Sequence, residues 1–250
     1  MVEFCWRLDA AWAGGVYCGW QRQPNALSVQ AVFEGVAQRI FNHPIVFSAA
    51  GRTDAGVHVA HQVLGMKTQK TMPLRALKRA FNGLLPNDIT VLAINEMPMD
   101  FNPRAWGYRK WYRYRWLFRE APCPFRRDYV WHLSTELNCE AMSEAAGHFE
   151  GTHEFSAFRA SGCSAKSTHR TIESSRFHPV SEDEWVLDVM GNGFLRHQVR
   201  IMAGTLLSVG QGRIHPSELP RIIQSGRREA AGQTAPAHGL TLMRSDVRTT

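Results

Sequence analysis

A short stretch between residues 48 and 58 places one arginine and one aspartate among glycines and alanines. Small residues allow a backbone to turn sharply and a large ligand to approach closely. Arg52 stands two positions before Asp54, where it could hold the carboxylate ionised and oriented, and an oriented carboxylate can act as a nucleophile. The same spacing fits an ordinary turn in which Asp54 caps backbone amides and Arg52 is solvated. From residue types alone, both interpretations stay open.

Residues 51–58 read GRTDAGVH, and this unbroken block resembles the signature of the tRNA pseudouridine synthase A (TruA) family. Other blocks in the order of that family extend the resemblance over nearly the whole chain: 19–24 (GWQRQP), 112–114 (YRY), 199–200 (VR) and 235–240 (APAHGL). The resemblance implies an isomerase that converts uridine to pseudouridine at positions 38, 39 and 40 in the anticodon stem-loop of tRNA. The reaction breaks the N1–C1′ bond and joins C5 to C1′, so it requires no redox or nucleotide cofactor.

The resemblance also assigns roles to particular side chains. It makes Asp54 the catalytic nucleophile and Tyr112 the residue that stacks on the target base, with a hydroxyl suited to receive the C5 proton. Arg52 resembles an arginine that helps extrude the nucleotide, Arg200 a basic residue that pairs with the aspartate, and Leu240 an apolar wall behind the base. Without the resemblance, each of these side chains could instead be structural, and the point of attack by Asp54, C1′ or C6, stays open.

The composition favours a globular protein with a polyanionic partner. A formal charge of +7 suits binding to nucleic acid through phosphate neutralisation, although a basic charge is also found in proteins that are merely soluble. The five scattered cysteines lack CxxC spacing, which argues against a disulfide framework and favours the cytoplasm. No apolar run approaches the roughly 18 residues of a membrane span. We therefore expect tRNA as the partner and no membrane association.

His58 and His61 are three residues apart, a spacing that raises the question of a metal site. On a strand their side chains would point to opposite faces, and no zincin-like or CxxC pattern accompanies them. We therefore predict no metal site.

Periodicity predicts strands and helices that alternate in both halves of an α+β protein. The resemblance adds a pseudouridine synthase fold, with two ferredoxin-like halves whose antiparallel sheets join around a central cleft, and a homodimer. We place the domains at 1–102, with the aspartate loop, and 103–250, with Tyr112 and Arg200. The predicted elements are strands at 2–12, 45–47, 57–66, 88–97, 110–116, 171–178, 184–190 and 240–243, and helices after Ser28 and Pro73 and at 138–149 and 195–209.

Two rival functions remain. A non-catalytic RNA-binding module would keep the basic and aromatic residues, but it would have no need of Asp54. A pseudouridine synthase that acts on another RNA would carry the same nucleophile loop.

The strand at 110–116 is predicted to divide its tyrosines and its arginines between two faces, so that Arg113 and Arg115 would face phosphate.

Overall fold

The computed structural model describes residues 3–248, which form two compact units. The first contains the chain up to Tyr108 and again from Leu242, and the second contains Arg109–Thr241. Strands β5 and β10 therefore each have residues in both units. The domain division expected at residues 102 and 103 stays a prediction.

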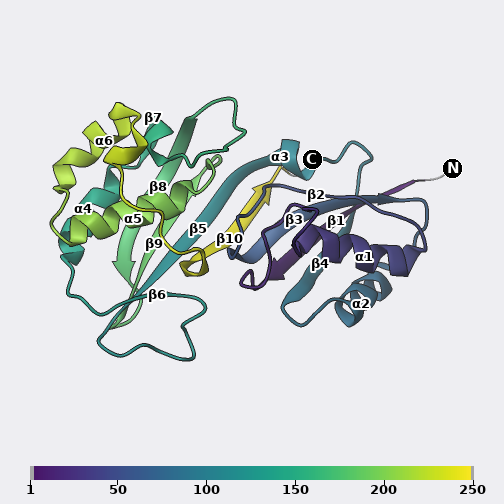
Figure 1. Ribbon diagram of the computed structural model, residues 1–250. Coiled ribbons are helices and arrows are strands. Elements are labelled where there is room, and N and C mark those ends of the chain that lie inside the picture. Colours follow the sequence, from purple (N-terminus) through teal and green to yellow (C-terminus); the bar gives the residue numbers. More distant parts are fainter. Residues whose placement is uncertain (1–2, 249–250) are drawn as a thin grey trace. The chain divides into compact units, whose positions relative to one another are not determined.

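The first unit is a layer of strands with two neighbouring helices (Figure 1). Its strand order is β4-β1-β3-β10, with β2 paired to β3, and the β1–β3, β1–β4 and β2–β3 pairs are antiparallel. The elements up to the start of β5 are β1 (Phe4–Trp12), α1 (Val29–Phe41), β2 (Phe47–Ala49), β3 (His58–Thr68), α2 (Leu74–Leu84), β4 (Ile89–Met97) and α3 (Pro103–Trp106).

Helix α1 begins where the sequence predicts. The Ser28 hydroxyl accepts a hydrogen bond from the Ala31 amide at 3.3 Å and so caps the helix. The buried face of α1 includes Phe33, whose ring lies 5.4 Å from that of Phe47 and 6.2 Å from that of Phe81 on α2. This aromatic cluster fixes both helices against the strand that leads into the aspartate loop.

The second unit combines strands in the order β5-β9-β8-β7 with helices, and β6 pairs with β5. All of these pairs are antiparallel except β5–β6. The elements are β5 (Gly107–Phe118), β6 (Trp131–Leu133), α4 (Cys139–Gly147), β7 (Gly151–Glu154), η1 (Ser156–Phe158), β8 (His169–Pro179), β9 (Glu184–Gly191), α5 (Gln198–Gly210), η2 (Pro216–Glu218), α6 (Leu219–Ser225), η3 (Arg228–Ala230), η4 (Ala237–Gly239) and β10 (Leu240–Val247).

Helix α5 is buried on nearly every side, which makes it the centre of the second unit. A Cβ at Gly204 would lie 1.8 Å from the Gln233 carbonyl oxygen, so the backbone of the 231–235 segment passes directly over the helix. Among the described residues, no helix is long and apolar enough to cross a membrane.

The α+β architecture with mostly antiparallel strands confirms the predicted fold class. Three local predictions were wrong. The strand expected at 45–47 is β2 at Phe47–Ala49, because Ser48 and Ala49 pair with β3. The segments 152–170 and 225–238 lie outside every predicted strand and helix, yet they contain most of β7, η1, the start of β8, the end of α6, η3 and part of η4.

Candidate functional site

Asp54 lies in the loop between β2 and β3, which backbone hydrogen bonds hold in place. The Trp20 amide donates to the Thr53 carbonyl at 3.2 Å, and the Gly56 amide donates to the Tyr17 carbonyl at 3.1 Å. The Val57 amide closes the turn on the Asp54 carbonyl at 3.2 Å. Bonds on both sides of Asp54 therefore fix its backbone, while its side chain stays partly exposed.

Two glycines outside the loop make this arrangement possible. Gly19 has φ +94°, and a Cβ there would lie 2.5 Å from the Thr53 carbonyl oxygen. A Cβ at Gly14 would lie 2.0 Å from the Val57 carbonyl oxygen. Only glycine, which has no Cβ, permits such close approach. The 14–20 segment can therefore pack backbone to backbone against the aspartate loop.

Tyr17 supports the loop through two hydrogen bonds, and nothing in the sequence marked it as a site residue. Its hydroxyl donates to Asp88 at 2.7 Å, and its carbonyl holds the Gly56 amide. Burial, together with the Asp88 carboxylate, raises the pKa of Tyr17 well above its usual value. This protonated tyrosine links the aspartate loop to the start of β4. A buried tyrosine between two glycine positions gives no sequence signal for such a contact.

The neighbours of Asp54 differ in their exposure. Thr53 is buried, and its hydroxyl has no hydrogen-bond partner among the described residues. Arg52 is exposed and makes no ion pair or hydrogen bond with the part of the chain that is described. The structure therefore gives no support to the expectation that Arg52 holds the Asp54 carboxylate, and it leaves the guanidinium open to solvent.

The two histidines near the loop have separate surroundings. His58 accepts the Gly14 amide on Nδ1 at 3.1 Å, so its other ring nitrogen carries the proton when the ring is neutral. His61 instead lies 3.7 Å from the Asp9 carboxylate. Within residues 3–248, no group of three or more His, Cys, Asp or Glu side chains is placed to hold a metal ion.

The other predicted site residues belong to the second unit. Tyr112 lies on β5 opposite Val189, is 8% exposed, and packs edge to face on Phe194 with ring centroids 5.0 Å apart. Two residues further along β5, the Tyr114 hydroxyl donates to the Pro236 carbonyl at 2.9 Å. Both tyrosines are therefore buried, Tyr114 completely and Tyr112 with 8% of its surface exposed.

Arg200 and Leu240 are connected by the segment that crosses α5. Arg200 Nε donates to the Ala235 carbonyl at 2.7 Å, and the Ala235 amide donates back to the Arg200 carbonyl at 3.0 Å. Leu240 follows the turn η4 and begins β10, where it is 4% exposed. Tyr114 anchors the same segment at Pro236, so one stretch of chain positions both Arg200 and Leu240.

The arginines on the outer face of β5 are neutralised by carboxylates. Arg113 makes a bidentate contact with Asp188 at 2.8 and 2.7 Å, and Arg115 contacts Glu184 at 2.7 Å. Although burial opposes it, the hydrogen bonds from Arg113, Trp111 and His178 lower the pKa of Asp188. The expectation that Arg113 and Arg115 face phosphate is therefore wrong, because each guanidinium is paired with a carboxylate of the neighbouring strand β9.

Comparisons with known proteins identify the class as an RNA-modifying isomerase. A family model described as tRNA pseudouridine synthase matches residues 11–104 and 145–246. Curated relatives named tRNA pseudouridine synthase A are 44% identical in Geotalea daltonii and 41% identical in Geobacter sulfurreducens, each over 95% of this chain and 97% of the relative. The chain belongs to the tRNA pseudouridine synthase A family. Membership separates it from non-catalytic RNA-binding modules.

One solved structure shows how far the likeness extends beyond these relatives. A chain of a Cbf5-Nop10-Gar1 complex is similar at 14% identity, with a TM-score of 0.39 over 92% of this chain and 48% of that chain. A likeness at that level carries no inference about function. The family match itself omits residues 105–144, the stretch that contains Tyr112.

Proposed function

We propose that this protein converts uridine to pseudouridine at positions 38, 39 and 40 in the anticodon stem-loop of tRNA, with Asp54 as the nucleophile. The observation that carries the proposal is the fixed backbone around Asp54, which hydrogen bonds from Trp20, Gly56 and Val57 define. A nucleophile held in one geometry avoids the entropic cost of orienting it during the reaction.

The chemistry needs three events. Asp54 attacks the target nucleoside, the N1–C1′ bond breaks, and the base turns so that C5 joins C1′ and the bond to Asp54 is broken. The hydrogen on C5 then leaves as a proton, and N1 gains one, so the product has the same mass as uridine. A general base must accept the C5 proton.

The remaining side chains are proposed to serve the extruded base. Tyr112 stacks on the uracil, and its hydroxyl is the candidate acceptor for the C5 proton. Arg200 pairs with the carboxylate of Asp54 and stabilises its ionised form, while Leu240 forms an apolar wall. The exposed Arg52 is free to contact RNA phosphate near the flipped nucleotide.

Mapping on defined substrates tests the proposed positions. Transcripts of one tRNA are prepared with uridine at only one of positions 38, 39 and 40 and cytidine at the other two. We expect pseudouridine at each retained uridine and nowhere else in the transcript. Pseudouridine at other positions alone, or in another RNA alone, would contradict the proposed target and favour the rival substrate.

We also propose that the protein is a homodimer in the cytoplasm. The five cysteines are all free, which suits a reducing compartment. Light scattering on the purified protein should give a mass twice the 28.3 kDa of one chain. A mass of one chain at the concentrations used for activity would contradict the dimer.

A further inference from the structure

A basic pocket of about 340 Å³ opens in the second unit, where η1 and α6 pack against each other. Its lining residues come from η1, the loop that follows it and the chain after α6: Ser156, Arg159, Ala160, Ser161, Gly162, Cys163, Gly226 and Arg228. Figure 1 shows α6 beside β7 in this part of the unit. None of these residues is among the proposed site residues.

Within residues 3–248, neither arginine that lines this pocket forms an ion pair with a carboxylate. Arg228 donates only to neutral acceptors, the Gly232 carbonyl at 2.8 Å, the Thr234 hydroxyl at 3.2 Å and the Ala231 carbonyl at 3.4 Å. Arg159 is exposed and has no ion-pair or hydrogen-bond partner for its side chain among the described residues. This differs from β5, where Arg113 and Arg115 are each paired with a carboxylate.

A third arginine shapes the loop at the rim. Arg196 donates to the Ser161 carbonyl at 3.1 Å, and its own carbonyl accepts the Ala160 amide at 3.1 Å. Gly162 follows with φ +72°, a conformation that side chains rarely adopt. The loop is thus held in place by a cation that itself lacks an acidic partner within the described chain.

The Glu154 carboxylate lies near the pocket, but it already accepts hydrogen bonds from two hydroxyl groups. Glu154 accepts hydrogen bonds from Ser156 and Thr168. One of its oxygens lies 3.6 Å from the position of a Cβ on Gly226. The neighbouring Glu229 lies 4.0 Å from Arg227. Of the residues that line the pocket, Arg159 and Arg228 are charged and both are basic.

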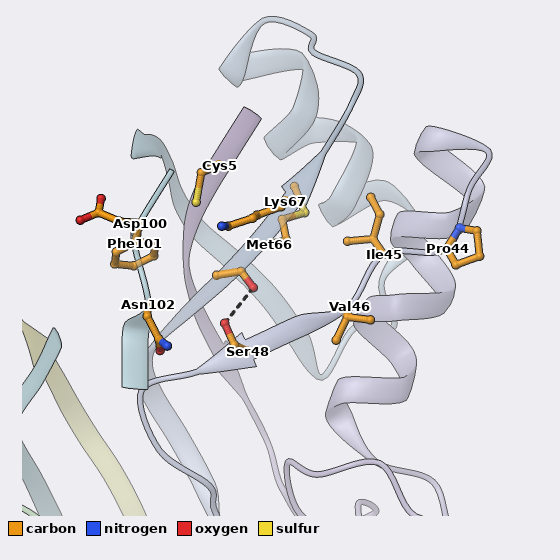
Figure 2. A pocket seen from close by; sticks show the side chains of 11 residues that line it. Cys5, Pro44, Ile45, Val46, Ser48, Met66, Lys67, Asp100, Phe101 and Asn102 are labelled. Carbon is orange, nitrogen blue, oxygen red and sulfur yellow. Dashed lines mark hydrogen bonds between the residues drawn. The ribbon is translucent and has the colours of Figure 1, made fainter. Parts of the chain in front are cut away.

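The larger pocket, in the first unit, lacks this character (Figure 2). Its volume is about 450 Å³ and, of the described residues that line it, Lys67 is the one basic residue. Lys67 donates to the Met99 carbonyl at 2.6 Å, and the acidic Asp100 lines the same pocket. A concentration of unpaired cations is therefore a feature of the second-unit pocket.

We propose that the pocket between Arg159 and Arg228 binds a phosphate group of the tRNA backbone, a proposal that rests on tRNA being the substrate. Guanidinium groups bind phosphate through charge-assisted hydrogen bonds. Arg228 is already oriented by its neutral acceptors, so little side-chain entropy is lost when the anion enters. Arg159 adds a second cation from the rim, and the Ser161 hydroxyl is a further donor.

The test compares tRNA affinity across a series of salt concentrations. Arg159→Gln removes one phosphate contact, so tRNA binding should weaken by about tenfold at low salt. The slope of log affinity against log salt should fall by about 0.7 to 0.9. Ser161→Asp places a negative charge at the rim and should weaken binding further. Arg213→Gln is the matched control, because Arg213 is an exposed arginine outside the pocket and the substitution changes the net charge equally.

Equal effects of Arg159→Gln and Arg213→Gln would overturn the proposal, since the loss would then be general electrostatics. Inorganic phosphate is titrated in parallel: saturable binding that depends on Arg159, with unchanged tRNA affinity, would assign the pocket to a free phosphate compound and overturn the tRNA source. A wild-type protein that shows the salt pattern without isomerisation would contradict the proposed function and leave the phosphate site supported.

Discussion

Gly19→Ala should disable the reaction without abolishing tRNA binding. The added Cβ would lie 2.5 Å from the Thr53 carbonyl oxygen, whereas ordinary contact begins at 3.4 Å. The loop must therefore shift by roughly 0.9 Å, and φ +94° adds a conformational cost of about 1–2 kcal/mol. A displacement near 1 Å can lower a rate by about 100-fold. We expect that loss in single-turnover isomerisation at saturating tRNA.

Gly15→Ala is the matched control for this substitution. A Cβ at Gly15 meets no atom within 4 Å, and its φ is not in the left-handed region. Its isomerisation rate should stay within about twofold of wild type, and both variants should bind tRNA with similar affinity. Wild-type turnover by Gly19→Ala, or an equal loss in Gly15→Ala, would refute the argument that backbone contact across Gly19 positions Asp54.

Further predictions concern stability. Asp188→Asn should lower the free energy of unfolding by about 2 kcal/mol at pH 7 in denaturant titrations, because Arg113 loses its ionised partner. Since the folded pKa of Asp188 is lowered, this contribution is present above the unfolded pKa near 3.9 and is lost as pH falls through the folded value, so variant and wild type should converge in acid. Gly204→Ala should cost several kcal/mol, because its Cβ would meet the Gln233 carbonyl at 1.8 Å. Gly35→Ala, exposed within α1 and with nothing within 4 Å, should instead raise the melting temperature through a gain of about 0.5–1 kcal/mol. The reverse order of these two glycine variants would contradict the packing described for α5.

Local signals in the sequence were sufficient for the long helices. Ser28 caps α1 as predicted, and the spacing of apolar residues located α5 within three residues of its start. Such elements depend on contacts close in the chain, so composition and periodicity are informative. Strand β2 was misplaced because Ser48 and Ala49 pair with Gly65 and Leu64 of β3, a contact that periodicity does not encode.

The candidate site, like strand β2, depends on contacts between distant parts of the chain that the sequence does not reveal. The GRTDAGVH block identified Asp54 and its loop, but the support from Tyr17 and Gly19 arises only when distant backbone segments meet. Similarly, alternation along β5 placed Arg113 on the face away from Tyr112, yet only the paired strand reveals Asp188, 75 residues away, as its partner. The ion pairs of Arg113 and Arg115 therefore argue against this face of β5 as an RNA-binding surface.

The nucleophilic role of Asp54 is the central claim, and tritium release from tRNA labelled at uracil C5 tests it most directly. Wild-type protein should release tritium to water, since C5 must lose its hydrogen when it joins C1′. Asp54→Asn is nearly isosteric and should bind tRNA within a few-fold of wild type yet release none, because the amide is a far poorer nucleophile. Sustained release by Asp54→Asn, in protein shown by mass spectrometry to be free of deamidation, would contradict the account.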